Sequence, residues 1–358
     1  MLFAESRVMG WEFNDCRFPT YRALQFKNLL SLIYVHLLKD YALNHYKRFS
    51  VKLQNLILKT AQKNSIINYI RNTVEVKGLR EIKASQIVEV VKKLCIEANY
   101  NLPEDILKEL KIRKKKEKSP LGQKILEDII LNAEIAMREK MAICQDTGMV
   151  VVFVEMGQEV CVVEGDLEEA INEGVRLGYK EGYLRKSVVK NPIERINTDD
   201  NTPAIVHYRV CRGDRLIITV MPKGAGSENM SALKMLKPSD GLEGVKRFVI
   251  ETVEKSGSNA CPPLIVGVGL GGDFEYAAYL AKRALLRKIG ERHEDILIAR
   301  LEEELLSEIN SLGIGPMGLG GTTTALDVHI EVYPTHIASL PVAVNLGCHA
   351  TRHASFVL

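Results

Sequence analysis

The sequence has seven cysteines but no Cys-x-x-Cys pair. That spacing is typical of zinc ribbons and thioredoxin-like redox proteins, so its absence argues against both classes. No hydrophobic run could cross a bilayer: Leu29 to Leu38 spans ten residues, whereas a membrane span needs roughly 20. The first residues also lack the charged, apolar and small-residue order of a signal peptide. Without such a signal, an odd number of cysteines predicts reduced thiols and a cytoplasmic protein.

Neither sign of charge dominates the chain, whose formal net charge is only +3. The charge is unevenly distributed, because residues 1–78 hold 12 of the 48 Lys and Arg, 5 of the 45 Asp and Glu, and half of the aromatic residues. We therefore predict a basic, aromatic-rich N-terminal extension over residues 1–78 and a larger domain over residues 79–358. The extension is expected to be helical or poorly ordered, and either a lineage-specific addition or absent from the native protein. We expect a solvated or partner-facing appendage rather than a surface for nucleic acid or a membrane.

Helix and strand patterns alternate irregularly after residue 79. Ser119-Pro120 predicts the start of a long helix that ends near Lys140, and Asp166 with Glu169 predicts another helix start. Residues 149–154 and 160–163 are expected to form one hairpin, and residues 204–210 and 216–221 a second. Because there is no regular strand–helix–strand alternation, the pattern favours an α+β fold over a doubly wound sheet.

Three cysteines lie in turns rich in Gly, Pro or Asn, with polar neighbours in place of apolar ones: Cys144, Cys261 and Cys348. Any one of them alone would more simply be a buried packing residue. Together, three thiolates could hold an iron–sulfur cluster that leaves one iron free to act as a Lewis acid on a substrate oxygen. An electron carrier would use a fourth cysteine, and none of the remaining four lies in a comparable loop: Cys16, Cys95, Cys161 and Cys211. The pattern therefore favours a hydro-lyase.

Polar residues near these cysteines have more than one interpretation. Asp146, two residues after Cys144, could be a general base, a hydrogen-bond partner of a metal ligand, or a turn residue before Gly148. Small residues in Lys223–Asn229 let backbone N–H groups approach an anion, and a carboxylate fits as well as a phosphate. Arg185 could clamp a carboxylate or lie on the surface.

The other candidates are histidines and a glycine run. His336 follows a predicted strand, and His349 and His353 lie beside Cys348. Gly267–Gly272 departs from the dinucleotide-binding spacing, so we expect no nicotinamide cofactor.

Taken together, these segments resemble the class I iron–sulfur fumarases and the two-subunit L(+)-tartrate dehydratases. The resemblance covers roughly residues 80–358 and is that of an α subunit. It rests on five ordered motifs: Ile143–Gly148, Met221–Asn229, Asn259–Pro263, Gly315–Thr323 and Asn345–His353.

The resemblance implies a 4Fe–4S cluster held by the three turn cysteines. It also implies substrate contacts from five further positions and the backbone near them: Gln145, Asp146, Arg185, Gly224 and Gly226. Asp146 would assist protonation of the substrate hydroxyl, and His336 would lie nearby as a catalytic residue. Because the sequence ends at Leu358, shortly after the last motif, the resemblance implies a separate β subunit that completes the site, in a heterotetramer of two α and two β chains.

We predict the reversible hydration of fumarate to (S)-malate. The first alternative is the dehydration of L(+)-tartrate to oxaloacetate, since tartrate has one more hydroxyl than malate and no residue here distinguishes them. An electron-transfer or scaffold subunit is the alternative from another class.

Overall fold

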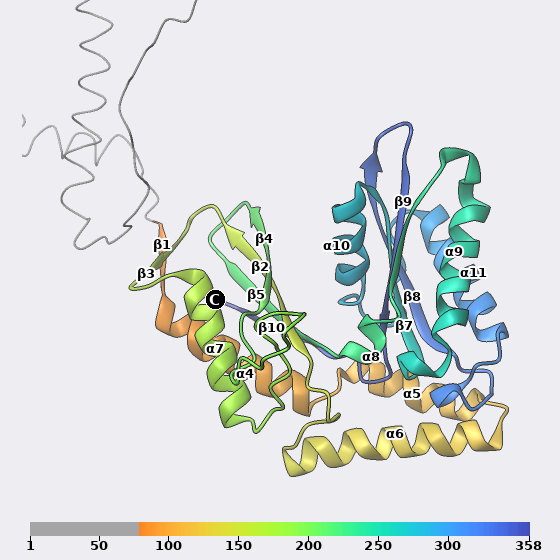
Figure 1. Cartoon of the computed structure of the whole chain (residues 1–358), viewed down its shortest axis with the longest axis horizontal. Coiled ribbons are helices and arrows are strands. Elements are labelled where there is room, and N and C mark those ends of the chain that lie inside the picture. The colour runs from red at the N-terminus through yellow and green to blue at the C-terminus, as the bar shows by residue number, and fades with distance from the viewer. Residues whose placement is uncertain (1–78) are drawn as a thin grey trace, which may run out of the picture. The chain divides into compact units, whose positions relative to one another are not determined.

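The computed structural model describes residues 79–358, and the extension predicted over residues 1–78 lies outside them (Figure 1). The described residues form two four-stranded sheets and a small parallel pair, β1 (Arg80–Lys83) with β3 (Val160–Val163). Each four-stranded sheet contains both parallel and antiparallel pairs. The predicted α+β fold is therefore confirmed. No helix among residues 79–358 is long and apolar enough to cross a membrane.

The first sheet has the strand order β10-β5-β2-β4. Its strands are β2 (Met149–Gly157), β4 (Ile205–Cys211), β5 (Leu216–Lys223) and β10 (Ala354–Val357). Both predicted hairpins are wrong, because β2 pairs with β4 and β5 rather than with β3, and β2 lies between β4 and β5. Short sequence separation favours a hairpin, but here burial of the strongly apolar β2 in the sheet centre prevails.

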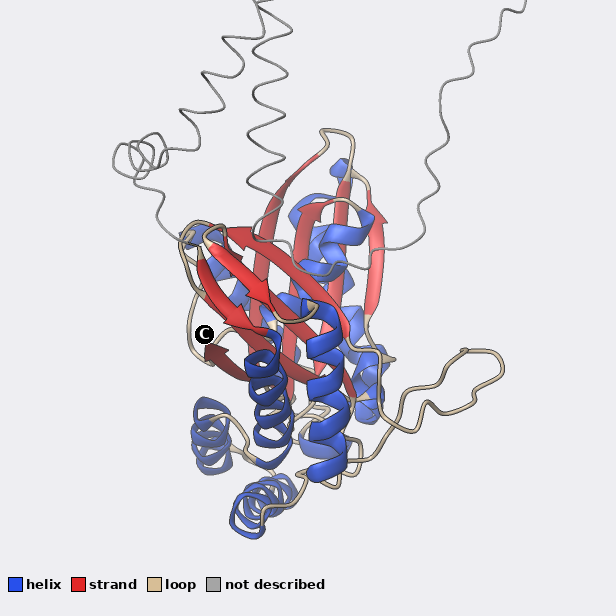
Figure 2. Ribbon diagram, turned by 90° about the vertical axis from the view of Figure 1, so that its left-hand side faces the viewer, coloured by secondary structure: helices blue, strands red, loops and turns tan. Residues whose placement is uncertain are grey.

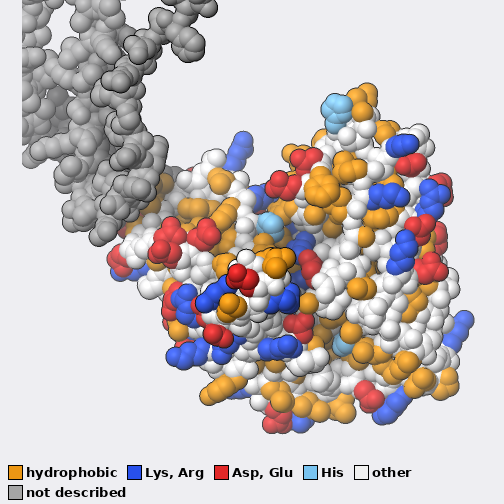
Figure 3. Space-filling model, in the orientation of Figure 1, with side chains coloured by type: hydrophobic (Ala, Val, Ile, Leu, Met, Phe, Trp, Pro, Cys, Tyr) orange, Lys and Arg blue, Asp and Glu red, His pale blue; other side chains and the backbone are white. Residues whose placement is uncertain are grey.

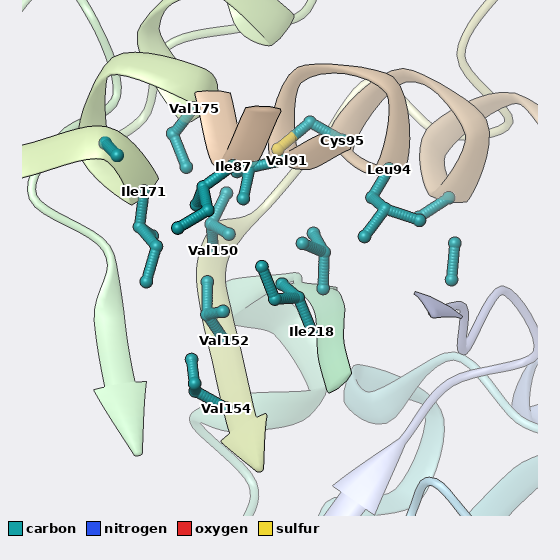
Figure 4. Packing of buried hydrophobic residues seen from close by; sticks show 14 of the residues in the cluster. Ile87, Val91, Leu94, Cys95, Val150, Val152, Val154, Ile171, Val175 and Ile218 are labelled. Carbon is teal, nitrogen blue, oxygen red and sulfur yellow. The ribbon is translucent and has the colours of Figure 1, made fainter. Parts of the chain in front are cut away.

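Alternation along β2 explains how this sheet packs. Val150, Val152 and Val154 point to one face, which is covered by α4 (Ala84–Tyr100) and α7 (Leu167–Glu181) (Figure 4). In the sequence, Ile87, Val91, Leu94 and Cys95 recur at helical spacing, which predicts a core position for Cys95, and Cys95 of α4 is fully buried. The alternate residues Val151 and Phe153 pack into a second cluster. This cluster draws on α5 (Glu104–Lys116) and α6 (Pro120–Glu139).

Helix ends follow the predicted capping chemistry. Ser119 Oγ accepts from the Gly122 N–H at the start of α6, which ends with Lys140 in a left-handed conformation. Asp166 accepts from the Glu168 and Glu169 N–H groups at the start of α7. Within Lys223–Asn229 the chain forms the single helical turn α8 (Ala225–Glu228), and a strand rather than a longer helix follows it.

The second sheet has the order β6-β9-β7-β8. Its strands are β6 (Ala232–Leu236), β7 (Leu264–Gly272), β8 (Ala325–Thr335) and β9 (Leu340–Gly347). One face packs on α9 (Gly241–Ser256) and α11 (Ile296–Ser311). The other face packs on α10 (Phe274–Ala284), close to β7. A Cβ added at Gly267 or Gly269 would lie 2.2 or 2.0 Å from a backbone oxygen of α10. The glycine run therefore permits helix packing, and it is part of β7 rather than a loop after it.

Candidate functional site

The ends of the two sheets bring the motifs together. β2 begins at Met149, just after the Cys144–Gly148 turn, and Met149 pairs with Lys223, the last residue of β5. In the second sheet, β7 begins three residues after Cys261, and Ile265 pairs with Gly347, which precedes Cys348. Pairing between strands thus places each cysteine at a strand end beside another motif.

Contacts of neighbouring residues link the three cysteine turns. The His349 N–H donates to the Cys261 carbonyl oxygen at 3.2 Å, and His349 Nδ1 lies 3.0 Å from the same oxygen. Cys348 packs against a small apolar cluster that includes Ile143, the neighbour of Cys144. Cys261 has a left-handed backbone, with φ of 54°, a conformation that is uncommon for non-glycine residues and concentrates at functional sites.

The donor set fits an iron–sulfur cluster. Burial raises the pKa of Cys261, and the nearby Cys348 and Cys144 thiols raise it further. Three thiolates gathered here would repel one another, so a bound cationic cluster would relieve that repulsion. Within residues 79–358 no group of three or more His, Cys, Asp or Glu converges as tightly as a single metal ion requires. A four-iron cluster distributes its cysteine ligands over separate irons and does not need that convergence.

Asp146 joins two of the motifs. Its Oδ1 accepts from the Gly148 N–H at 2.9 Å, and its Oδ2 accepts from the Ala225 N–H at 2.8 Å. The turn interpretation is therefore observed, and the carboxylate is also held at the start of α8. Gly224 lies directly beneath it, because a Cβ there would be 3.1 Å from Asp146 Oδ2. Gly226 is exposed and faces Asn259, next to the Cys261 loop.

A network of charged side chains around the buried Lys223 stabilises the start of α8, where Asp146 is held. Lys223 Nζ donates to Ser227 Oγ at 2.9 Å and to the Leu346 carbonyl oxygen at 2.8 Å, and pairs with Glu228 at 3.1 Å. Glu228 also contacts Lys282 of α10 and accepts from Asn345 Nδ2. Burial opposes ionisation of Glu228, but the Lys223 and Lys282 ammonium groups hold its pKa at about 2. The network fixes α8 against β9, two residues before Cys348.

Arg185 and Gln145 present exposed side chains beside the turn. Thr147 Oγ1 donates to the Arg185 carbonyl oxygen at 2.7 Å, which ties the Arg185 backbone to the Cys144–Gly148 turn. The guanidinium group of Arg185 is left free of any ion pair within residues 79–358 and can meet an anion.

His336 does not join the other residues. It follows Thr335, which pairs with Gly272 at the far end of β7 from Cys261. The nine residues of β7 separate the two ends, a span of about 26 Å at the usual rise per residue. A sequence pattern cannot show at which end of a strand a residue lies until the pairing is known.

Lys223 and Arg352 lie within two of the five motifs, but the sequence pattern assigned no role to either side chain. Arg352 is buried, and its guanidinium donates to the Asp146 carbonyl oxygen at 2.6 Å and to Asn99 Oδ1 at 3.2 Å. A basic residue inside a motif and next to apolar or small residues is a signal that could have indicated such a role.

The part of the chain that forms this site matches a known protein family. Residues 88–357 match the family model described as Fumarate hydratase (Fumerase). The chain belongs to the Fumerase family. The resemblance predicted from the five motifs is therefore confirmed, and the whole matched region lies within the described residues.

Curated relatives of this Fumerase family member bear a different enzyme name. The chain is 49% identical over 275 residues to the putative L(+)-tartrate dehydratase subunit alpha of Methanocaldococcus jannaschii, covering 75% of this chain and 96% of that protein. It is 34% identical over 278 residues to the L(+)-tartrate dehydratase subunits alpha of Escherichia coli O157:H7 and Shigella boydii, covering 76% of this chain and 91% of each. These names favour the tartrate alternative over the fumarate prediction.

Proposed function

We propose that this chain is the α subunit of an iron–sulfur hydro-lyase that removes water from L(+)-tartrate to form oxaloacetate. One observation carries the proposal. The three cysteine turns lie at the ends of the two four-stranded sheets, and the Asp146–Ala225 contact lies among them. The named relatives support tartrate as the substrate. The hydration of fumarate is the second candidate, because the matching family model carries that name.

Cys144, Cys261 and Cys348 would hold a 4Fe–4S cluster. When bound, the cluster supplies a Lewis acid that makes the substrate hydroxyl a better leaving group. The contacts of Lys223 with Glu228 and with the Leu346 carbonyl oxygen would hold the Cys348 loop in place beside the Asp146 turn.

Residues of the chain itself would bind and orient the substrate. Arg185 would bind one carboxylate through two parallel hydrogen bonds, which fixes its direction. The exposed backbone at Gly226 and the Gln145 amide would contact the remaining oxygens. Asp146 would assist protonation of the leaving hydroxyl, and the Gly148 and Ala225 N–H groups fix the direction of its carboxylate. His336 of the same chain has no part in this proposed site, because it lies at the other end of β7.

A separate β subunit would complete the site, as the relatives' designation as α subunits suggests. A dicarboxylate needs a second cation, and both Lys223 and Arg352 are buried and already paired. The proposed assembly contains two α and two β chains.

The test is an anaerobic assay of the chain reconstituted with iron, sulfide and the β-type subunit of the same organism. Oxaloacetate formation reports tartrate dehydration, and ultraviolet absorbance reports fumarate consumption. We expect tartrate to have the higher kcat/KM. Faster turnover of fumarate would select the second candidate, and turnover of neither substrate by a cluster-loaded sample would refute the hydro-lyase proposal.

A further inference from the structure

A long segment between α7 and β4 stands away from the rest of the described residues. Residues 182–204 contain no helix or strand beyond one isolated bridge, Val189 with Asn197. Figure 2 shows this loop extending from the end of α7. Loops of more than about 12–15 residues without secondary structure are uncommon in compact domains and are usually either functional or disordered. We call residues 185–198 the arm.

The arm is internally ordered. Its two sides are joined by hydrogen bonds from the Lys190 N–H to the Ile196 carbonyl oxygen at 2.8 Å and from the Thr198 N–H to the Val188 carbonyl oxygen at 2.9 Å. At the tip, Asn191 Oδ1 accepts from the N–H groups of Ile193 and Glu194. Fixing a backbone in this way costs conformational entropy. The side chains at the tip recover little of it within the described residues, because residues 190–196 are all exposed.

The exposed surface of the arm combines apolar and basic side chains. Ile193 is 87% exposed and Ile196 is 58% exposed. Four basic residues accompany one acidic residue, Glu194; they are Arg185, Lys186, Lys190 and Arg195. In the space-filling view, Lys and Arg side chains over the region where Figure 1 draws α7 and β10 lie among Asp, Glu and hydrophobic ones (Figure 3). An apolar tip on a basic arm suits an apolar pocket with an acidic rim.

The base of the arm is fixed to the candidate site. Asn201, fully buried, accepts from the Ser187 N–H at 2.7 Å and donates to the Gly148 carbonyl oxygen at 3.2 Å. Thr147 Oγ1 holds the Arg185 carbonyl oxygen. A protein held by the arm would therefore lie beside the Cys144–Gly148 turn, where the site needs a second cation.

We propose that the arm is the docking element for the β subunit, with Ile193 and Ile196 as anchors in an apolar, acid-rimmed pocket of that subunit. This inference rests on the proposed function, which requires a second chain at this face. A second copy of the same chain is the competing occupant, and the measurements below distinguish it from the β subunit.

The experiment measures binding without substrate. The full chain and the purified β-type subunit of the same organism are titrated anaerobically by calorimetry. The double variant Ile193→Glu/Ile196→Glu should bind at least ~100-fold more weakly, because each buried anchor contributes roughly 30-fold or more. The matched control Ile296→Glu/Leu297→Glu changes two apolar residues of α11 that are 69% and 72% exposed. It should bind within about threefold of the unmodified chain.

A second measurement uses the charges. Lys190→Glu/Arg195→Glu should slow association at low salt by roughly tenfold, and the difference should shrink at high salt. All variants should keep the same circular dichroism and melting temperature, because the altered side chains are exposed.

Unchanged affinity of the isoleucine double variant for β would overturn the inference. If that variant also lost self-association of the chain, the arm would dock on a second copy instead. Failure of the proposed function is distinguishable. In that case the arm variants would still weaken β binding, while the unmodified complex would convert neither tartrate nor fumarate.

Discussion

At the residue scale, Cys144 is the most direct probe of the cluster. Cys144→Ser should abolish both activity and the visible absorbance of the reconstituted chain, because one of the three proposed cluster ligands would be lost. Absorbance spectra and iron content, measured with tartrate turnover after anaerobic reconstitution, check this. Cys161→Ser is the control, since Cys161 lies on β3 away from the site and should leave both properties intact. An active, colourless Cys144→Ser variant would refute the assignment.

Also at the residue scale, Glu228 couples stability to pH. Its pKa is lowered from 4.5 to about 2, so its contribution to stability is complete above pH 4.5 and is lost as pH falls toward 2. Glu228→Gln should lower the free energy of unfolding at pH 7 by about 1–3 kcal/mol, after allowance for the partial exposure of the carboxylate. It should also flatten the pH dependence between pH 4.5 and 2.

Urea unfolding at pH 7, 5, 4 and 3 measures both effects. Glu304→Gln is the control, because Glu304 pairs with Lys246 on the surface and should contribute less than about 1 kcal/mol. The network would have no such role if Glu228→Gln and the unmodified chain lost stability in parallel.

At the scale of elements, the contact between β7 and α10 depends on glycine. A Cβ at position 269 would lie 2.0 Å from the Ala277 carbonyl oxygen, so Gly269→Ala must push α10 away from the sheet. We expect a loss of about 1–3 kcal/mol or more, which thermal unfolding would show as a fall of several degrees.

Gly226→Ala is the matched control for that change. Its nearest neighbour would be 3.5 Å away, an ordinary contact, and its backbone conformation suits alanine. Its melting temperature should therefore stay within about 2 °C of the unmodified chain. Equal stability of the two variants would show that α10 packs less closely than the structure indicates.

At the scale of the whole molecule, the three proposed cluster ligands come from the ends of both four-stranded sheets. Cluster binding should therefore stabilise the entire described unit, since a ligand bound only by the folded state raises its stability. Anaerobic calorimetry should show a higher melting temperature after reconstitution with iron and sulfide. Cys348→Ser should show no such increase. An unchanged melting temperature in a sample shown to contain the cluster would contradict this coupling.

Local chemistry allowed much of this protein to be predicted from its sequence. The Ser119 and Asp166 caps, the burial of Cys95 and the family resemblance each depend on residues close together in the chain. Steric and hydrogen-bonding preferences act strongly between residues that are close in sequence, so these features can be predicted without a structure.

Strand pairing was decided only by the tertiary structure. β2 takes the sheet centre because both of its faces are apolar, and this separates β4 from β5 and leaves β3 to pair with β1. The same pairing carries His336 to one end of β7 and Cys261 to the other. It also brings Asp146, Lys223 and Arg352 to a single site through contacts that join distant segments. Such contacts depend on how whole surfaces bury one another, which residue order alone does not specify.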